Sequence, residues 1–165
     1  QYGTMDTLGQ DRIAAVAGSL ASLPHPAPAA SPSLIVDAGT CATLDLVSAD
    51  GTYLGGNISP GIRMRLRAMH AFTARLPELE PDTVTGRVGQ STTAALRHGA
   101  QLGLAYEIEG LYGRLQADFP GLQLLLTGGD APWLAEHLSV PYVFRPHLVL
   151  RGLHLILSNY VTNES

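Results

Sequence analysis

The sequence contains no lysine, because all ten of its basic residues are arginine. This absence excludes a P-loop lysine, a Schiff-base lysine and a lysine general base. Any phosphate chemistry must therefore use glycine amides, hydroxyl groups, arginine and metal ions. The formal net charge of −4 and the scattered acidic residues also leave no basic face for a phosphate backbone, so we expect no nucleic acid as a partner.

Sulfur chemistry and membrane insertion have equally little support. Cys41 is the single cysteine, which excludes an internal disulfide, and the six histidines show no zinc-ligand spacing. No stretch approaches the roughly 18 consecutive apolar residues of a membrane span, and the N-terminus lacks the basic-then-apolar pattern of an export signal. We therefore expect a cytoplasmic protein that does not cross a membrane.

Hydrophobic spacing predicts a mixed α/β protein. The helical pattern occurs in five segments: 11–23, 61–77, 91–119, a segment after 130, and 147–160. Short β-prone runs occur in five others: 34–36, 42–47, 52–58, 122–126 and 142–144. Residues 24–33 are rich in proline, alanine and serine, which predicts a flexible linker between a unit at 1–23 and a larger unit at 34–165.

Three glycine-containing turns are candidates for phosphate binding. Asp37-Ala-Gly-Thr40 ends a hydrophobic strand, and its carboxylate, amides and hydroxyl suit a cation and a nucleotide phosphate. Gly55–Gly61 leads from a strand into a helix, whose amides and dipole attract an anion. Thr127–Asp130 repeats that arrangement, with Asp130 as a predicted cap of the next helix. Each turn also fits a simple connection, but three of them in one small domain favour a nucleotide.

The candidate proton acceptor is Asp11, in the motif Gly9-Gln10-Asp11-Arg12. A carboxylate beside a flexible glycine can accept a proton from a substrate hydroxyl, and the adjacent Arg12 can hold a substrate carboxylate. The pattern alone favours a simpler interpretation, in which Asp11 stabilises the N-terminus of its helix and Arg12 is solvated.

In combination and in order, these motifs resemble the type III pantothenate kinase family: Tyr2 seven residues before Gly9, GQDR at 9–12, DAGT at 37–40, GGNISPGIR at 55–63, TGRVGQST at 85–92 and LTGGDA at 126–131. This family belongs to the actin-like ATPases and sugar kinases, which are built from two related lobes with ATP between them. The resemblance implies a ribonuclease H-like lobe with a mixed β-sheet flanked by helices. It also implies ATP-dependent phosphorylation of pantothenate to 4′-phosphopantothenate, the first step of coenzyme A synthesis.

The resemblance assigns roles to particular residues. Asp11 is the expected proton acceptor for the pantothenate hydroxyl, and Asp37 the expected ligand of a monovalent cation, K⁺ or NH₄⁺. The expected pantothenate site is Tyr2, Gly9, Gln10, Asp11, Arg12 and Thr92. The expected ATP site, with Mg²⁺ on the nucleotide, is Gly39, Thr40, Gly56, Gly128 and Gly129. A homodimer is also implied, and the small residues of its candidate helix contact are Ala95, Gly99 and Gly103.

The sequence departs from the family pattern at one point. The family opens with a strand and an Asp-x-Gly-Asn-Thr/Ser loop that holds ATP phosphates, and no such motif occurs in this sequence, which begins at Gln1. We therefore expect an N-terminal portion that this chain does not include. Two alternatives stay open: a non-catalytic homologue that acts as a transcriptional accessory factor, and a sugar kinase of the same superfamily.

Overall fold

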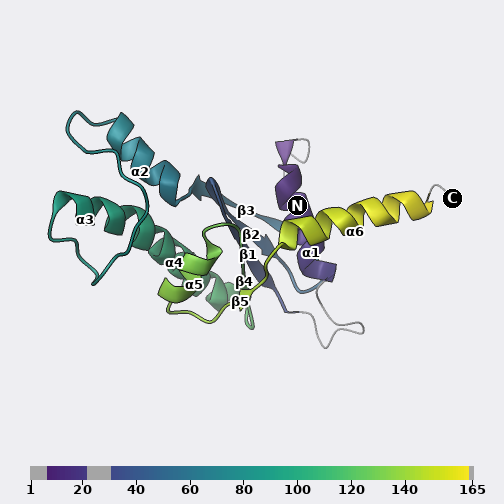
Figure 1. The fold of residues 1–165 in the computed structure, drawn as a ribbon. Coiled ribbons are helices and arrows are strands. Elements are labelled where there is room, and N and C mark those ends of the chain that lie inside the picture. The colour runs from purple at the N-terminus through teal and green to yellow at the C-terminus, as the bar shows by residue number, and fades with distance from the viewer. Residues whose placement is uncertain (1–6, 22–30, 164–165) are drawn as a thin grey trace.

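The computed structural model describes residues 7–21 and 31–163, which form a mixed α/β fold (Figure 1). The helices are α1 (Gln10–Ala21), α2 (Ile62–Ala71), α3 (Thr92–Arg97), the π-helical turn η2 (His98–Leu102), α4 (Gly103–Asp118), α5 (Ala131–His137) and α6 (Leu148–Asn163). The strands are β1 (Ser33–Ala38), β2 (Cys41–Val47), β3 (Tyr53–Pro60), β4 (Gln123–Thr127) and β5 (Val143–Phe144). The predicted site residue Tyr2 and residues 24–30 of the predicted linker lie outside the described residues.

The sheet has the strand order β3-β2-β1-β4-β5. β1 pairs antiparallel with β2 and parallel with β4. At the edges of the sheet, β3 pairs antiparallel with β2, and β5 pairs parallel with β4. Helices lie on both sides of this mixed sheet (Figure 1). The predicted α/β class, with a mixed β-sheet flanked by helices, is thus confirmed. None of the described helices is long and apolar enough to cross a membrane.

The larger hydrophobic core lies between the sheet and the helices α2, α4 and α5. Leu34, Val36 and Ala38 alternate along β1 and are completely buried in this core. The helices contribute apolar residues at helical spacing: Leu66, Leu104, Ile108 and Leu134. Because successive strand residues point to opposite faces, Ile35 and Asp37 of β1 face the other side of the sheet.

On that other side, α1 and α6 pack against the sheet and against each other (Figure 1). Ile35, Leu125 and Leu148 belong to a second, smaller core there. The two helices cross at Gly18 and Gly152, where a Cβ added to Gly152 would lie 1.7 Å from the Ala14 carbonyl oxygen. The backbones therefore touch at the crossing, and α6 fixes the position of α1 on the sheet.

Helix α2 is shorter than its hydrophobic pattern predicts. It ends at Ala71 rather than near Pro77, and the chain continues as an irregular segment, residues 72–91. Leu76 still packs against the larger core although it lies beyond the helix. Leu76 fits the helical spacing in the sequence because its side chain is partly buried, although the residue itself lies outside the helix.

The helix predicted at 91–119 is present but is interrupted by the π-helical turn η2, in which Gln101 is completely buried. The Gln101 side-chain oxygen accepts a hydrogen bond from the Asp82 amide at 3.2 Å, and its nitrogen donates one to the Asp82 carbonyl at 2.9 Å. Nε2 of His98 lies 3.0 Å from the Thr85 carbonyl oxygen. These contacts hold the irregular segment against the helix.

The α1–α6 crossing leads to a prediction about stability. We expect Gly152→Ala to destabilise the fold by about 1–3 kcal/mol, because the new methyl group meets backbone that cannot rotate away. The midpoint of thermal unfolding, measured by circular dichroism, should fall by about 2–4 °C for each kcal/mol.

Gly113 in α4 is the matched control, because a Cβ added there meets no heavy atom within 4 Å. Gly113→Ala should be neutral or stabilise by up to about 1 kcal/mol. Equal melting temperatures for the two variants would contradict the close backbone contact.

Candidate functional site

The GQDR motif lies where the chain enters α1. Asp11 is exposed in the first turn of the helix, and its Oδ1 accepts a hydrogen bond from the Arg12 amide at 2.9 Å. A Cβ added to Gly9 would lie 2.4 Å from that Oδ1, so the carboxylate folds back over a position that has no side chain. The local structure thus combines both interpretations of Asp11: it stabilises the helix N-terminus and stays open to a substrate.

Arg12, by contrast, points into the sheet. Its side chain is only 4% exposed, and its Nε and Nη2 atoms lie 2.9 and 2.6 Å from Oδ1 of Asp45 on β2. Nη2 also donates a hydrogen bond to the Tyr53 hydroxyl oxygen at 2.7 Å. The solvated Arg12 of the simpler interpretation is therefore wrong, and the guanidinium faces Asp45 rather than an open surface.

Asp37 lies near this pair, on the face of the sheet that carries α1. The β1–β2 register pairs Ile35 with Asp45 and Asp37 with Thr43, which places the two carboxylates on the same face. Burial raises the pKa of the Asp37 carboxyl above its ordinary value of 3.8, and the neighbouring charges of Asp11 and Asp45 raise it further. A bound cation would offset this repulsion.

No group of three or more histidine, cysteine, aspartate or glutamate residues in the described ranges is arranged to hold a metal ion. The carboxylates of Asp37, Asp11 and Asp45 therefore interact through their charges without forming a shared metal site in the described part of the chain.

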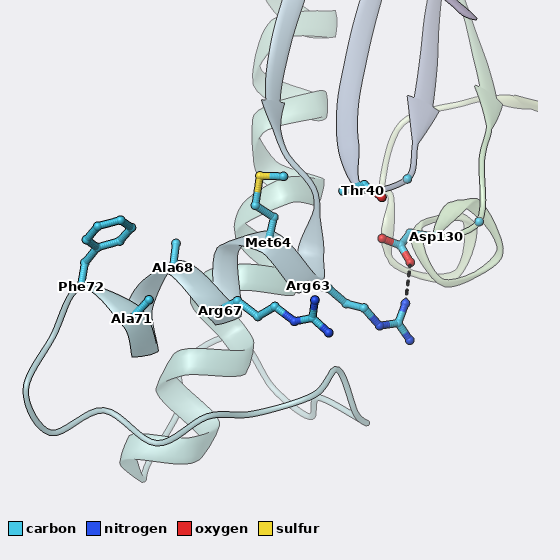
Figure 2. A pocket seen from close by; sticks show the side chains of 10 residues that line it. Thr40, Arg63, Met64, Arg67, Ala68, Ala71, Phe72 and Asp130 are labelled. Atoms are coloured by element: carbon cyan, nitrogen blue, oxygen red, sulfur yellow. Dashed lines mark ion pairs between the residues drawn. The ribbon is translucent and has the colours of Figure 1, made fainter.

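A cavity of about 530 Å³ opens beside the tip of the β1–β2 hairpin (Figure 2). The hairpin and the turn after β4 contribute Gly39, Thr40, Gly129 and Asp130, and α2 with its C-cap contributes Arg63, Met64, Arg67, Ala68, Ala71 and Phe72. The cavity thus combines backbone amides, a hydroxyl and two guanidinium groups with an apolar wall. This composition suits a nucleotide, whose base is apolar on its faces and whose phosphates are anionic.

Asp130 helps to close one end of the cavity. Its carboxylate lies 3.9 Å from Nη1 of Arg63, and Figure 2 shows the two side chains facing each other. Burial raises the pKa of Asp130, whereas Arg63 and a backbone hydrogen bond with Ile62 act in the opposite direction. Asp130 occupies the predicted N-cap position of α5, but its side chain makes no hydrogen bond to that helix and faces Arg63 of α2 instead.

The five residues of the expected ATP site do not all meet at the cavity. Gly39, Thr40 and Gly129 line it, whereas Gly128 and Gly56 do not. Gly128 has a φ of 100° and lies against Ala38, so it serves the turn itself. Gly56 belongs to strand β3 rather than to a loop, because β3 continues to Pro60.

The other part of the expected pantothenate site, Thr92, lies far from Asp11. Thr92 is in the first turn of α3, and Figure 1 shows α3 and α1 at opposite ends of the structure. A second hollow of about 530 Å³ lies beside α3, lined by residues of the TGRVGQST motif together with Arg97 and His98. A single copy of the described chain therefore does not bring Thr92 and Asp11 together.

Three residues that hold the motifs in place through side-chain hydrogen bonds were not singled out from the sequence: Asp45, Tyr53 and Gln101. Asp45 interrupts an otherwise apolar strand eight residues after Asp37, and strand alternation across the hairpin could have placed both on one face. Gln101 gives no comparable signal, because a polar residue within a helical pattern is normally exposed.

Comparison with known proteins agrees with these motifs. A type III pantothenate kinase from Phocaeicola vulgatus is 42% identical over 157 residues, covering 95% of this chain and 63% of that protein. One from Flavobacterium johnsoniae is 36% identical over 164 residues, covering 99% and 65%. The chain thus spans about three-fifths of the length of the curated relatives that it matches.

A solved structure is also similar. The crystal structure of a conserved putative Baf family transcriptional activator from Campylobacter jejuni superposes with a TM-score of 0.65 at 26% identity, covering 96% of this chain and 67% of the other. The sequence model of the type III pantothenate kinase family matches residues 1–114, which is more than half of the chain. From this match, and from the order of its motifs, the chain belongs to the type III pantothenate kinase family.

Proposed function

We propose that the chain takes part in the ATP-dependent phosphorylation of pantothenate to 4′-phosphopantothenate, the first step of coenzyme A synthesis. The observation that carries this proposal is the exposed Asp11 carboxylate, which lies near Asp37 on one face of the sheet. The membership of the family supports pantothenate as the substrate rather than a sugar.

In the proposed reaction, Asp11 accepts the proton of the pantothenate hydroxyl. The hydroxyl oxygen forms a bond to the γ-phosphorus of ATP while the bond from that phosphorus to the β–γ bridging oxygen breaks, and ADP leaves with the bridging oxygen. Because phosphoryl transfer needs mainly positioning and charge neutralisation, a chain without lysine can perform it. Mg²⁺ would arrive with the nucleotide and neutralise its phosphates.

We place the nucleotide in the cavity beside the hairpin. Thr40 and the amides of Gly39 and Gly129 are the proposed phosphate ligands, and Arg63 and Arg67 add positive charge. Both arginines form ion pairs with the exposed carboxylate of Glu80, and such surface pairs contribute little and can be exchanged for phosphate oxygens.

We further propose a homodimer in which Thr92 of a second copy completes the pantothenate site. The separation of α3 from α1 supports this arrangement. Two residues of the predicted helix contact, Ala95 and Gly99, are exposed, and a Cβ added to Gly99 meets no heavy atom within 4 Å. The third, Gly103, is half-buried beside Arg65.

The similarity to the Baf structure favours one other function. That protein is named as a putative transcriptional activator, so a non-catalytic accessory role is the second candidate. The two candidates differ in whether Asp11 is needed for turnover.

We expect potassium-dependent ATP consumption with pantothenate and Mg²⁺, and a loss of about 10²–10⁴-fold in kcat for Asp11→Asn, since the variant keeps the shape but cannot accept the proton. A coupled assay of ADP release measures both. Asp118→Asn on the exposed end of α4 is the control and should keep full activity. An absence of turnover, both in this chain and in a form extended to the length of its relatives, would favour the accessory role.

The raised pKa of Asp37 leads to a separate prediction. The folded state holds this proton more tightly than the unfolded state does, so stability falls as the pH rises from 3.8 through the raised pKa. Potassium at the carboxylate would offset that loss. We expect KCl to raise the melting temperature above that obtained with NaCl of equal ionic strength at pH 7, but not below pH 3.8.

Asp37→Asn removes the charge at this position and should abolish the difference between the two salts. Differential scanning fluorimetry gives the melting temperatures without requiring activity. A potassium effect of the same size in Asp37→Asn would show that the cation binds elsewhere.

A further inference from the structure

Arg12, Asp45 and Tyr53 form a buried polar cluster between α1 and the sheet. Asp45 has no exposed surface, and three donors converge on its Oδ1: the Nε and Nη2 atoms of Arg12 at 2.9 and 2.6 Å and the Tyr53 hydroxyl at 2.9 Å. Arg12 Nη2 also bonds to the Tyr53 oxygen, which closes a ring of hydrogen bonds. Charge-assisted bonds in such a dry site are strong and directional.

The strands leave space for this cluster at Gly56. A Cβ added to Gly56 would lie 2.7 Å from Asp45 Oδ1 and 2.9 Å from Arg12 Nη2. Gly56 pairs with Asp45 across β2 and β3, so the glycine lies directly beside the carboxylate. The GGNISP motif therefore accommodates the arginine at this point, which gives its second glycine a function separate from phosphate binding.

The cluster fixes the first turn of α1. The closest backbone contacts of α1 with Gly152 of α6 are at Ala14 and Gly18, which follow the turn that carries Asp11. Arg12 connects that first turn to β2 and β3, on which Asp45 and Tyr53 lie. Because Asp11 and Arg12 are adjacent, anchoring the arginine inside the sheet leaves the Asp11 carboxylate on the exposed side.

We propose that Asp45 and Tyr53 are positioning residues, which hold the proton acceptor Asp11 in place through Arg12. This inference rests on the proposed function for its kinetic consequence, whereas the anchoring of residues 9–13 can be measured without turnover. Arg12 acts from inside the fold: its guanidinium contacts Asp45 and Tyr53 beneath the motif.

The kinetic test uses Tyr53→Phe and Asp45→Asn, each of which keeps the size of the side chain. A displacement of the base by about 1 Å costs on the order of 100-fold, so we expect kcat to fall by about that factor in Asp45→Asn and about tenfold in Tyr53→Phe. The KM for ATP should stay within about twofold of the original value, because the proposed nucleotide cavity is elsewhere. Tyr106→Phe and Asp118→Asn, both exposed, are the matched controls.

The double variant Arg12→Gln with Asp45→Asn separates positioning from simple charge balance. It removes both buried charges, so its melting temperature should recover relative to Asp45→Asn, in which the arginine is left uncompensated. Positioning predicts that kcat stays low in the double variant. Recovery of kcat together with the melting temperature would overturn the proposal.

Amide hydrogen exchange decides the anchoring even if no variant shows turnover. The amides of Arg12 and Ile13, which donate to the Gly9 carbonyl, are the reporters. We expect these two amides to exchange at least about tenfold faster in Tyr53→Phe and Asp45→Asn, while residues 15–20, which α6 holds, exchange at the original rate. Unchanged exchange at Arg12 and Ile13 would overturn the inference. Faster exchange in a chain without turnover would leave the anchoring established and would count against the proposed kinase activity alone.

Discussion

The pairing of β1 on both of its edges is the constraint on which the rest of the structure depends. Because β2 and β4 occupy its two edges, each β1 side chain must point to one face of the sheet or the other. One set, which includes Leu34 and Val36, fills the larger core. The other set contains Asp37, which lies on the same face as Asp45 and near Asp11. The alternation of side chains along β1 thus builds the core on one face of the sheet and places Asp37 beside the other carboxylates on the opposite face.

The proposed chemistry is distributed over separate parts of this frame. The proposed proton acceptor Asp11 lies where α1 begins, the proposed nucleotide cavity lies at the hairpin tip, and Thr92 lies at the far end of the structure on α3. A different contact holds each part. The buried ion pair of Arg12 and Asp45 holds the start of α1, and the close approach of Gly61 holds the hairpin tip. The side chain of Gln101 holds the irregular segment that leads to α3. The site is therefore assembled from locally stable pieces rather than from one continuous pocket.

Sequence patterns predicted the helices and strands well, because periodicity reports directly which side of an element is buried. They predicted less of the site, because its important contacts join residues distant in the chain. Arg12 and Asp45 are paired across 33 positions, and nothing near either residue indicates the other. Gly56 shows the same limit: its neighbours predicted a phosphate loop, whereas the structure places it beside a buried arginine. Gln101 was missed since its partner is backbone, which has no sequence signature.

The glycine crossing of α1 and α6 also has a consequence for how the protein is made. Gly18 leaves the ribosome long before Gly152, so the contact between them forms only after α6 has been synthesised. Until then α1 lacks its close backbone contact with α6. All five strands precede α6 in the chain, so α1 can complete its packing only after the whole sheet has been synthesised.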